Sequence, residues 1–184
     1  MCPMRKHLPR FMLLLGILVS GCHAFGPPRP YGLRITRDDS MKDSRTAVDL
    51  VVVNQNDMTN TWCSSILGSM GKYWGEEEKG RREGWLKKTQ GHAKAVEFEP
   101  RSYSQEIASK DPMWPAQTTD LYLVVLADLR TSRKPGSEDP QWRLCLPLDR
   151  RYWPETKALE IDVSREGVRL VTPPARRFQY PCPR

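Results

Sequence analysis

Alternating hydrophobic and polar residues recur along the chain and predict β-strands. In the segment "YGLRITR", residues 31–37, Leu33 and Ile35 alternate with Arg34 and Thr36, as in a strand with one buried face. The valine-rich run 46–55 and the apolar run 119–130 are typical of buried strands. Weaker strand patterns occupy residues 93–100, 142–149, 158–164 and 166–174. About seven strands separated by turns predict an all-β sandwich.

One segment, residues 60–90, does not follow the strand pattern. Hydrophobic residues recur there at helical spacing: Ile66, Leu67, Met70, Tyr73 and Trp74. Glycines at positions 68, 71, 75, 80 and 84 weaken a long helix. We therefore expect a short helical insertion near 63–88, made of one or two helices that pack on the sandwich.

The N-terminus has the pattern of a secretory signal. Phe11–Gly21 is an uncharged run of eleven residues, preceded by three basic residues and no acid. A membrane-spanning helix needs about 20 apolar residues, so this run is too short to cross a bilayer. Small residues directly before Cys22 resemble a bacterial lipobox, in which the cysteine receives a diacylglycerol and the chain is cut before it. Residues 1–21 are thus predicted to be a signal peptide.

The predicted mature chain consists of the lipidated Cys22, a proline-rich tether to residue 30, and a domain at 31–184. Removal of residues 1–21 lowers the net charge from +7 to 26 − 22 = +4. Basic and acidic residues are interspersed along the sequence, which does not favour nucleic-acid binding. Export to an oxidising compartment makes one disulfide plausible among Cys63, Cys145 and Cys182, but the sequence leaves its pairing open.

The sequence contains no recognisable catalytic motif. GxSxG, HExxH, GxGxxG and P-loop patterns are absent, and His92 is the one histidine of the 31–184 domain. Asp38, Asp39 and Asp43 lack the glycine and terminal glutamate of an EF-hand loop, so no metal site is predicted. We expect no cofactor and no enzymatic activity, and favour a binding or scaffold role.

Two other functions remain open at this point. A different envelope-binding module, for cell-wall glycan or another protein, would need an exposed aromatic groove using Trp74, Trp85 or Trp114. A carboxylate-dependent hydrolase would need two acidic side chains that converge in a cleft.

The order of the segments resembles that of the TssJ family, the outer-membrane lipoproteins of bacterial type VI secretion systems. After the lipobox come "LRITRDDSMKDS", a first strand with an acidic turn, and "AVDLVVVNQ", a valine-rich second strand. The helical insertion follows, then "AVEFEPRSYSQEI", "TTDLYLVVLADLRTS" and "QWRLCLPLD". The resemblance covers most of residues 31–148. The family's Asn-Pro after the first strand is absent, and Met41 and Lys42 stand there instead.

The resemblance implies a transthyretin-like β-sandwich, anchored through Cys22 at the periplasmic face of the outer membrane. It also implies a partner, the periplasmic domain of the inner-membrane protein TssM, in an envelope-spanning complex. In the family the loop between the first two strands carries much of this contact, and here that loop is 37–45. The implied partner-binding residues are Asp38, Asp39, Met41, Lys42 and Asp43. Met41 would supply an apolar contact, and the charged residues would set the register.

Overall fold

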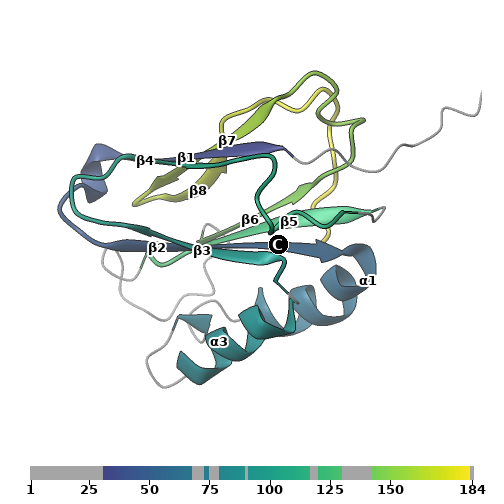
Figure 1. Ribbon diagram of the computed structural model, residues 1–184, viewed down its shortest axis with the longest axis horizontal. Helices are drawn as coiled ribbons and strands as arrows, with labels where there is room; N and C mark the ends of the chain where they lie inside the picture. The colour runs from purple at the N-terminus through teal and green to yellow at the C-terminus, as the bar shows by residue number, and fades with distance from the viewer. Residues whose placement is uncertain are drawn as a thin grey trace, which may run out of the picture.

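The computed structural model describes residues 31–67, 73–74, 79–89, 91–116, 120–129 and 142–182. Two four-stranded sheets face each other, and a helical insertion covers the outer face of one of them (Figure 1). The predicted all-β sandwich is therefore confirmed. Cys22, with the predicted signal peptide and tether, lies outside the described residues. Within them, no helix combines the length and the apolar character that a membrane span requires.

Sheet A contains the first and the last strands of the fold, in the order β4-β1-β7-β8. Its strands are β1 (Gly32–Arg37), β4 (Ser104–Ile107), β7 (Ala158–Ser164) and β8 (Gly167–Leu170). The pair β1 and β7 is parallel, and the other two pairs are antiparallel. Alternate residues of this sheet point to the core, as the sequence predicted.

Sheet B is antiparallel throughout, in the order β3-β2-β5-β6. Its strands are β2 (Thr46–Asn54), β3 (Ala93–Phe98), β5 (Leu121–Ala127) and β6 (Arg143–Pro147). Strands β2 and β5 are buried almost continuously. One face of these strands meets sheet A, and the insertion covers the other, which explains their unbroken apolar sequences.

The described residues form eight strands, one more than the hydrophobic pattern predicts. The additional strand is β4, a four-residue edge strand in which only Ile107 is buried. A single buried position gives no alternation to detect, so the pattern missed it. The resemblance to the TssJ family did include a polar strand in this segment.

The helical insertion begins earlier than expected. Asn54 ends β2, and its side-chain oxygen accepts a hydrogen bond from the Asp57 amide at 2.8 Å, which caps the helix that follows. Gln55 therefore opens a helix and does not end the strand. The helical segments are α1 (Gln55–Asp57), the π-helix η2 (Met58–Ile66) and α3 (Lys79–Lys88).

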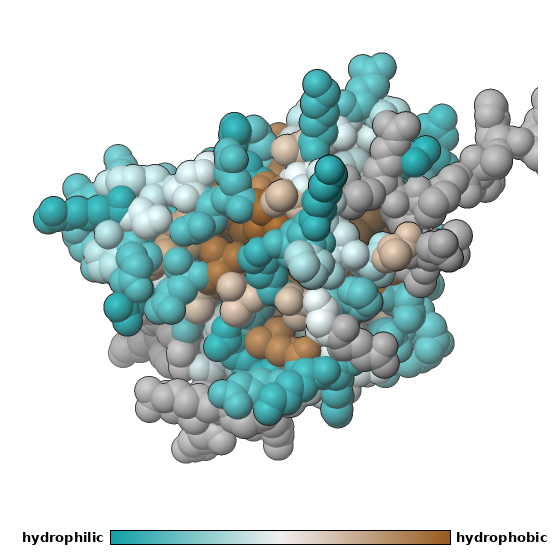
Figure 2. Space-filling model, in the orientation of Figure 1, coloured by the Kyte–Doolittle hydropathy of each residue, from teal (hydrophilic) through white to brown (hydrophobic). Residues whose placement is uncertain are grey.

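The outer face of sheet A is polar and open to solvent. Arg34 on β1 forms ion pairs with Glu106 on β4 and Glu160 on β7, at 3.0 and 3.1 Å. On β8, Arg169 pairs with Asp162 of β7 at 2.9 Å. Figure 2 shows hydrophilic side chains over most of the visible surface, with hydrophobic ones near the seam between the two sheets and in a second patch between sheet B and the helices. The sandwich is thus covered asymmetrically, by helices on sheet B and by charged side chains on sheet A.

Candidate functional site

Three turns meet at one end of the sandwich, on the left in Figure 1. They are the β1–β2 loop (37–45), the β3–β4 turn (99–103) and the β7–β8 turn, and together we name them the loop end. Main-chain hydrogen bonds join them: the Asp38 amide donates to the Val163 carbonyl at 2.9 Å, and the Arg101 amide to the Lys42 carbonyl at 2.7 Å. The predicted partner-binding loop is therefore attached to both neighbouring turns.

A buried arginine binds the main chain of this loop from the core side. Arg37 continues the inward alternation of β1 and is only 3% exposed. Its guanidinium donates to the main-chain carbonyls of Ser44 (2.5 Å), Lys42 (3.3 Å) and Glu99 (3.1 Å), and it lies over the Phe98 ring at 5.6 Å. A charged group with carbonyl acceptors on both turns fixes their relative position.

Four of the five predicted loop residues point to solvent: Asp38, Asp39, Lys42 and Asp43 are exposed. Asp38 also has a structural role, because its carboxylate accepts the Ser40 amide at 2.8 Å and caps the 3-10 helix η1 (Asp39–Met41). Hydrogen bonds from the Ser40 side chain and amide hold the pKa of Asp38 below its usual value.

The structure contradicts the expected role of Met41 as an apolar contact for a partner. It is 2% exposed and belongs to the hydrophobic core, so in this structure it cannot offer an apolar contact to a partner. The 3-10 turn directs the side chain inward and leaves the polar residues around it on the surface. A methionine within a charged segment resembles an exposed apolar contact, because no periodic pattern in residues 37–45 predicts this turn.

The chain enters the fold at the opposite end of the sandwich. Tyr31 is 2% exposed, and the Gly32 amide donates to the Lys157 carbonyl at 3.0 Å, which fixes the start of β1. The six residues of β1 then run the length of sheet A, about 20 Å at 3.3 Å per residue. Tyr31 and the start of β1 therefore lie far from the loop end.

A buried ionic cluster fastens the helical insertion to sheet B. Asp49 of β2 is completely buried and accepts two hydrogen bonds from Arg82 of α3, both at 2.6 Å, and one from the Tyr73 hydroxyl at 2.8 Å. The Arg82 guanidinium also lies over the Trp74 ring at 4.8 Å. Burial, and then the Asp49 charge, raise the pKa of Tyr73 far above its usual value. The valine-rich sequence around Asp49 gave no hint of this contact.

The three tryptophans considered for an aromatic groove differ in exposure: Trp74 is buried, whereas Trp85 and Trp114 are half-buried. Trp74 is 5% exposed, and Trp114 is half-buried with its indole donating to the Ala108 carbonyl at 3.1 Å. Trp85 and His92 instead line a separate pocket of about 420 Å³. The other lining residues are Val52, Val53, Asn54, Asp57, Thr61, Trp62, Lys88, Thr89, Pro115 and Leu121.

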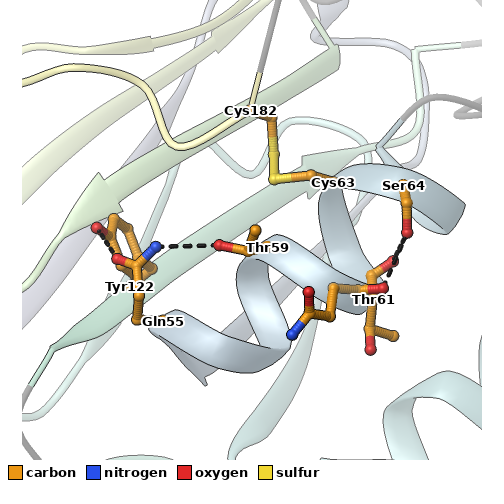
Figure 3. Close-up of a disulfide and its surroundings, with 8 residues drawn as sticks. Gln55, Thr59, Thr61, Cys63, Ser64, Tyr122 and Cys182 are labelled. Carbon is orange, nitrogen blue, oxygen red and sulfur yellow. Dashed lines mark hydrogen bonds between the residues drawn. A yellow bond between two sulfur atoms is a disulfide. The ribbon is translucent and has the colours of Figure 1, made fainter.

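The disulfide joins Cys63 to Cys182, at a sequence separation of 119, and ties the insertion to the C-terminal tail (Figure 3). Next to it, the Tyr122 hydroxyl donates to Gln55 Oε1 at 2.5 Å, and Gln55 donates to the Thr59 hydroxyl at 3.1 Å. Among the cysteines that the structure describes, Cys145 is the free thiol, and burial raises its pKa to about 12.

The buried carboxylates of the described residues do not converge. Asp49 lies in sheet B and Asp162 in sheet A, and each is held by an arginine. No group of three histidine, cysteine or acidic residues suited to a metal ion occurs within the described part of the chain. These acids serve the packing of the fold and do not form the pair that a hydrolase would use.

Comparison with solved structures finds six similar chains, and three of them belong to type VI secretion systems. The chain resembles type VI secretion lipoproteins. Serratia marcescens Lip, a membrane-bound component of the type VI secretion system, is 14% identical with a TM-score of 0.46, over 79% of this chain and 97% of Lip. The lipoprotein TssJ1 of Pseudomonas aeruginosa is 14% identical with a TM-score of 0.45, over 82% of this chain and 100% of TssJ1.

A chain of a type VI membrane complex is 17% identical with a TM-score of 0.49, over 77% of this chain and 97% of that one. No protein-family model matches the sequence, and no curated protein matches it. At these identities the likeness concerns the fold, so no residue role is transferred from these proteins.

Proposed function

We propose that this chain is a lipid-anchored scaffold protein of a type VI secretion system. In this proposal Cys22 carries the lipid, at the periplasmic face of the outer membrane. The loop end binds the periplasmic domain of a TssM-like inner-membrane protein and helps to build the envelope-spanning complex. Asp38, Asp39, Lys42 and Asp43 supply the contact.

The observation that carries the proposal is the position of the loop end relative to the start of the fold. A tether from Cys22 joins the domain at Tyr31, and the exposed charges of the 37–45 loop lie at the other end. A protein anchored in this way presents the loop away from its own membrane, toward a partner that comes from the opposite side of the periplasm.

The rigidity of the loop also supports a binding role. Arg37 and the main-chain bonds to the neighbouring turns hold the loop in one conformation before any partner arrives. A preorganised surface loses less conformational entropy on association. Because the exposed side chains are charged, they are suited to fix orientation and to raise the association rate.

A binding measurement with a TssM periplasmic fragment tests the partner. We expect the double variant D39K/D43K to raise Kd about tenfold, since each reversal removes one attraction and adds one repulsion. Asp39 and Asp43 suit this test because neither side chain caps the 3-10 turn as Asp38 does. The matched control is E83K/E155K, which reverses two exposed acids outside the loop end. Absence of binding by the unsubstituted protein, or equal effects of the two variants, would refute the assigned contact.

Lipidation is tested separately by metabolic labelling with palmitate and by mass spectrometry of the mature chain. We expect acyl chains on Cys22, cleavage before it, and loss of both in the C22S variant. An unlabelled chain, or a mature N-terminus elsewhere, would contradict the anchor.

A further inference from the structure

Two segments that are distant in sequence come together at the end of the domain where Tyr31 and Gly32 begin the fold, which we name the tether end. They are the β6–β7 connection (148–157) and the C-terminal tail (171–182). The Ala175 amide donates to the Tyr152 carbonyl at 2.8 Å, and the Phe178 ring packs against the rings of Tyr152 and Trp153, with centroids 5.6 and 6.1 Å apart. Trp153 is 1% exposed, so the tail is packed onto the core of the domain.

This packing concentrates positive charge. The two segments contain five basic residues, Arg150, Arg151, Lys157, Arg176 and Arg177, and two acids, which gives 5 − 2 = +3. The predicted mature chain has a net charge of +4, so most of its excess lies in these 22 residues. Along the sequence these residues looked dispersed, because the fold alone brings 150 and 176 together.

Four of these cations are available for an external partner. Arg151 is neutralised by Asp149 at 2.6 Å. Within the described part of the chain, no ion pair involves Arg150, Lys157, Arg176 or Arg177, and we name these four residues the basic surface. Lys157, Arg176 and Arg177 are exposed, and Arg150 is half-buried. Glu155 is the remaining acid of the two segments.

The basic surface borders the point where the chain enters the fold. The Lys157 carbonyl accepts a hydrogen bond from the Gly32 amide, so the start of β1 lies beside this residue. The tail also exposes Val171 (49%) and Tyr180 (43%), two of the large hydrophobic side chains on the described surface. Cationic and aromatic side chains beside an anchoring point are the combination found where proteins touch lipid headgroups.

We propose that the basic surface binds the anionic lipid headgroups of the membrane that carries the anchor. This inference rests on the proposed lipidation of Cys22, which would bring the surface within reach of the bilayer. Acyl chains already give firm attachment, so the electrostatic contact acts mainly on orientation. It holds the tether end against the headgroups and directs the loop end into the periplasm.

The test uses the mature chain from residue 22 with the substitution C22S, which has no acyl group and retains every described element. It is sedimented with vesicles of phosphatidylcholine alone, or of phosphatidylcholine with phosphatidylglycerol, at low and at physiological salt. We expect binding to the anionic vesicles only, weakened by salt. In the R176Q/R177Q variant the partition coefficient should fall roughly 25-fold, from about fivefold for each charge near an anionic surface.

The matched control is R101Q/R165Q, which removes two cations from the loop end, and circular dichroism checks that all variants are folded. Equal losses in the two variants, or no binding of the unsubstituted chain to anionic vesicles, overturn the proposal. Displacement by inorganic phosphate, beyond that by chloride at equal ionic strength, would indicate a phosphate-ion site and overturn it as well. Because this chain is unacylated, a failed lipidation experiment leaves the vesicle result unchanged, and the two failures can be distinguished.

Discussion

Replacing Arg37 with methionine tests whether a buried cation holds the loop end together. Its bonds to the Ser44 and Glu99 carbonyls are well formed, and hydrogen bonds of a charged group contribute about 2 kcal/mol each. The bond to Lys42, at 3.3 Å, is weaker. Because Arg37 Nε is buried without a partner, removing the charge recovers about 1 kcal/mol of desolvation. Methionine retains the packing over Phe98. We therefore expect R37M to lower the free energy of unfolding by about 3 kcal/mol.

The measurement combines urea unfolding with hydrogen exchange of the amides in the 37–45 loop. In R37M these amides should exchange faster than in the unsubstituted protein, because the loop loses its central attachment. The control is R34M on the same strand. Arg34 pairs with Glu106 and Glu160 on the exposed face, where ion pairs contribute at most about 1 kcal/mol. If R37M costs no more than R34M and exchange in the loop is unchanged, Arg37 does not organise the loop end.

Two further predictions concern the attachment of the helical insertion. The double variant C63A/C182A should lose about 4–5 kcal/mol of unfolding free energy, because the disulfide closes a loop of 119 residues in the unfolded chain; a loss below 1 kcal/mol in urea unfolding would contradict this. D49N should cost about 2–3 kcal/mol, since Arg82 is left partly buried without its counter-charge, whereas D162N, whose arginine partner is 75% exposed, should cost about 1 kcal/mol or less. Equal costs for the two substitutions would show that burial of the Asp49 pair has no energetic effect.

Local patterns were sufficient for most of the architecture. Leu159, Ile161 and Val163 alternate in the sequence, and all three are fully buried in β7. The pattern could not assign strands to sheets, since the parallel pairing of β1 with β7 depends on contacts across the whole chain. The Cys63–Cys182 bond was equally open, because either cysteine could have reached Cys145 by spacing alone.

The loop end shows why surface chemistry was harder to predict than strands. The exposure of Asp39 and Asp43 follows from their polarity, but Met41 turns inward through a 3-10 helix that no periodic pattern announces. Arg37 occupies the next inward position after Leu33 and Ile35, so continuing the alternation would have located it. Its positive charge made an outward position the expected one, and the burial is explained by its main-chain carbonyl partners, two in its own loop and one in the β3–β4 turn.

The parallel pairing of β1 with β7 has a consequence for the order in which the molecule can fold. Gly32 is paired with Ala158, and β1 lies between β4 and β7 at the centre of sheet A. The first strand to be synthesised therefore lacks one neighbour until almost the whole chain is present. Contacts of such long sequence separation form slowly. A nascent chain of this protein stays without a completed sheet A until its final strands arrive, which would suit the unfolded export that the proposed signal peptide requires.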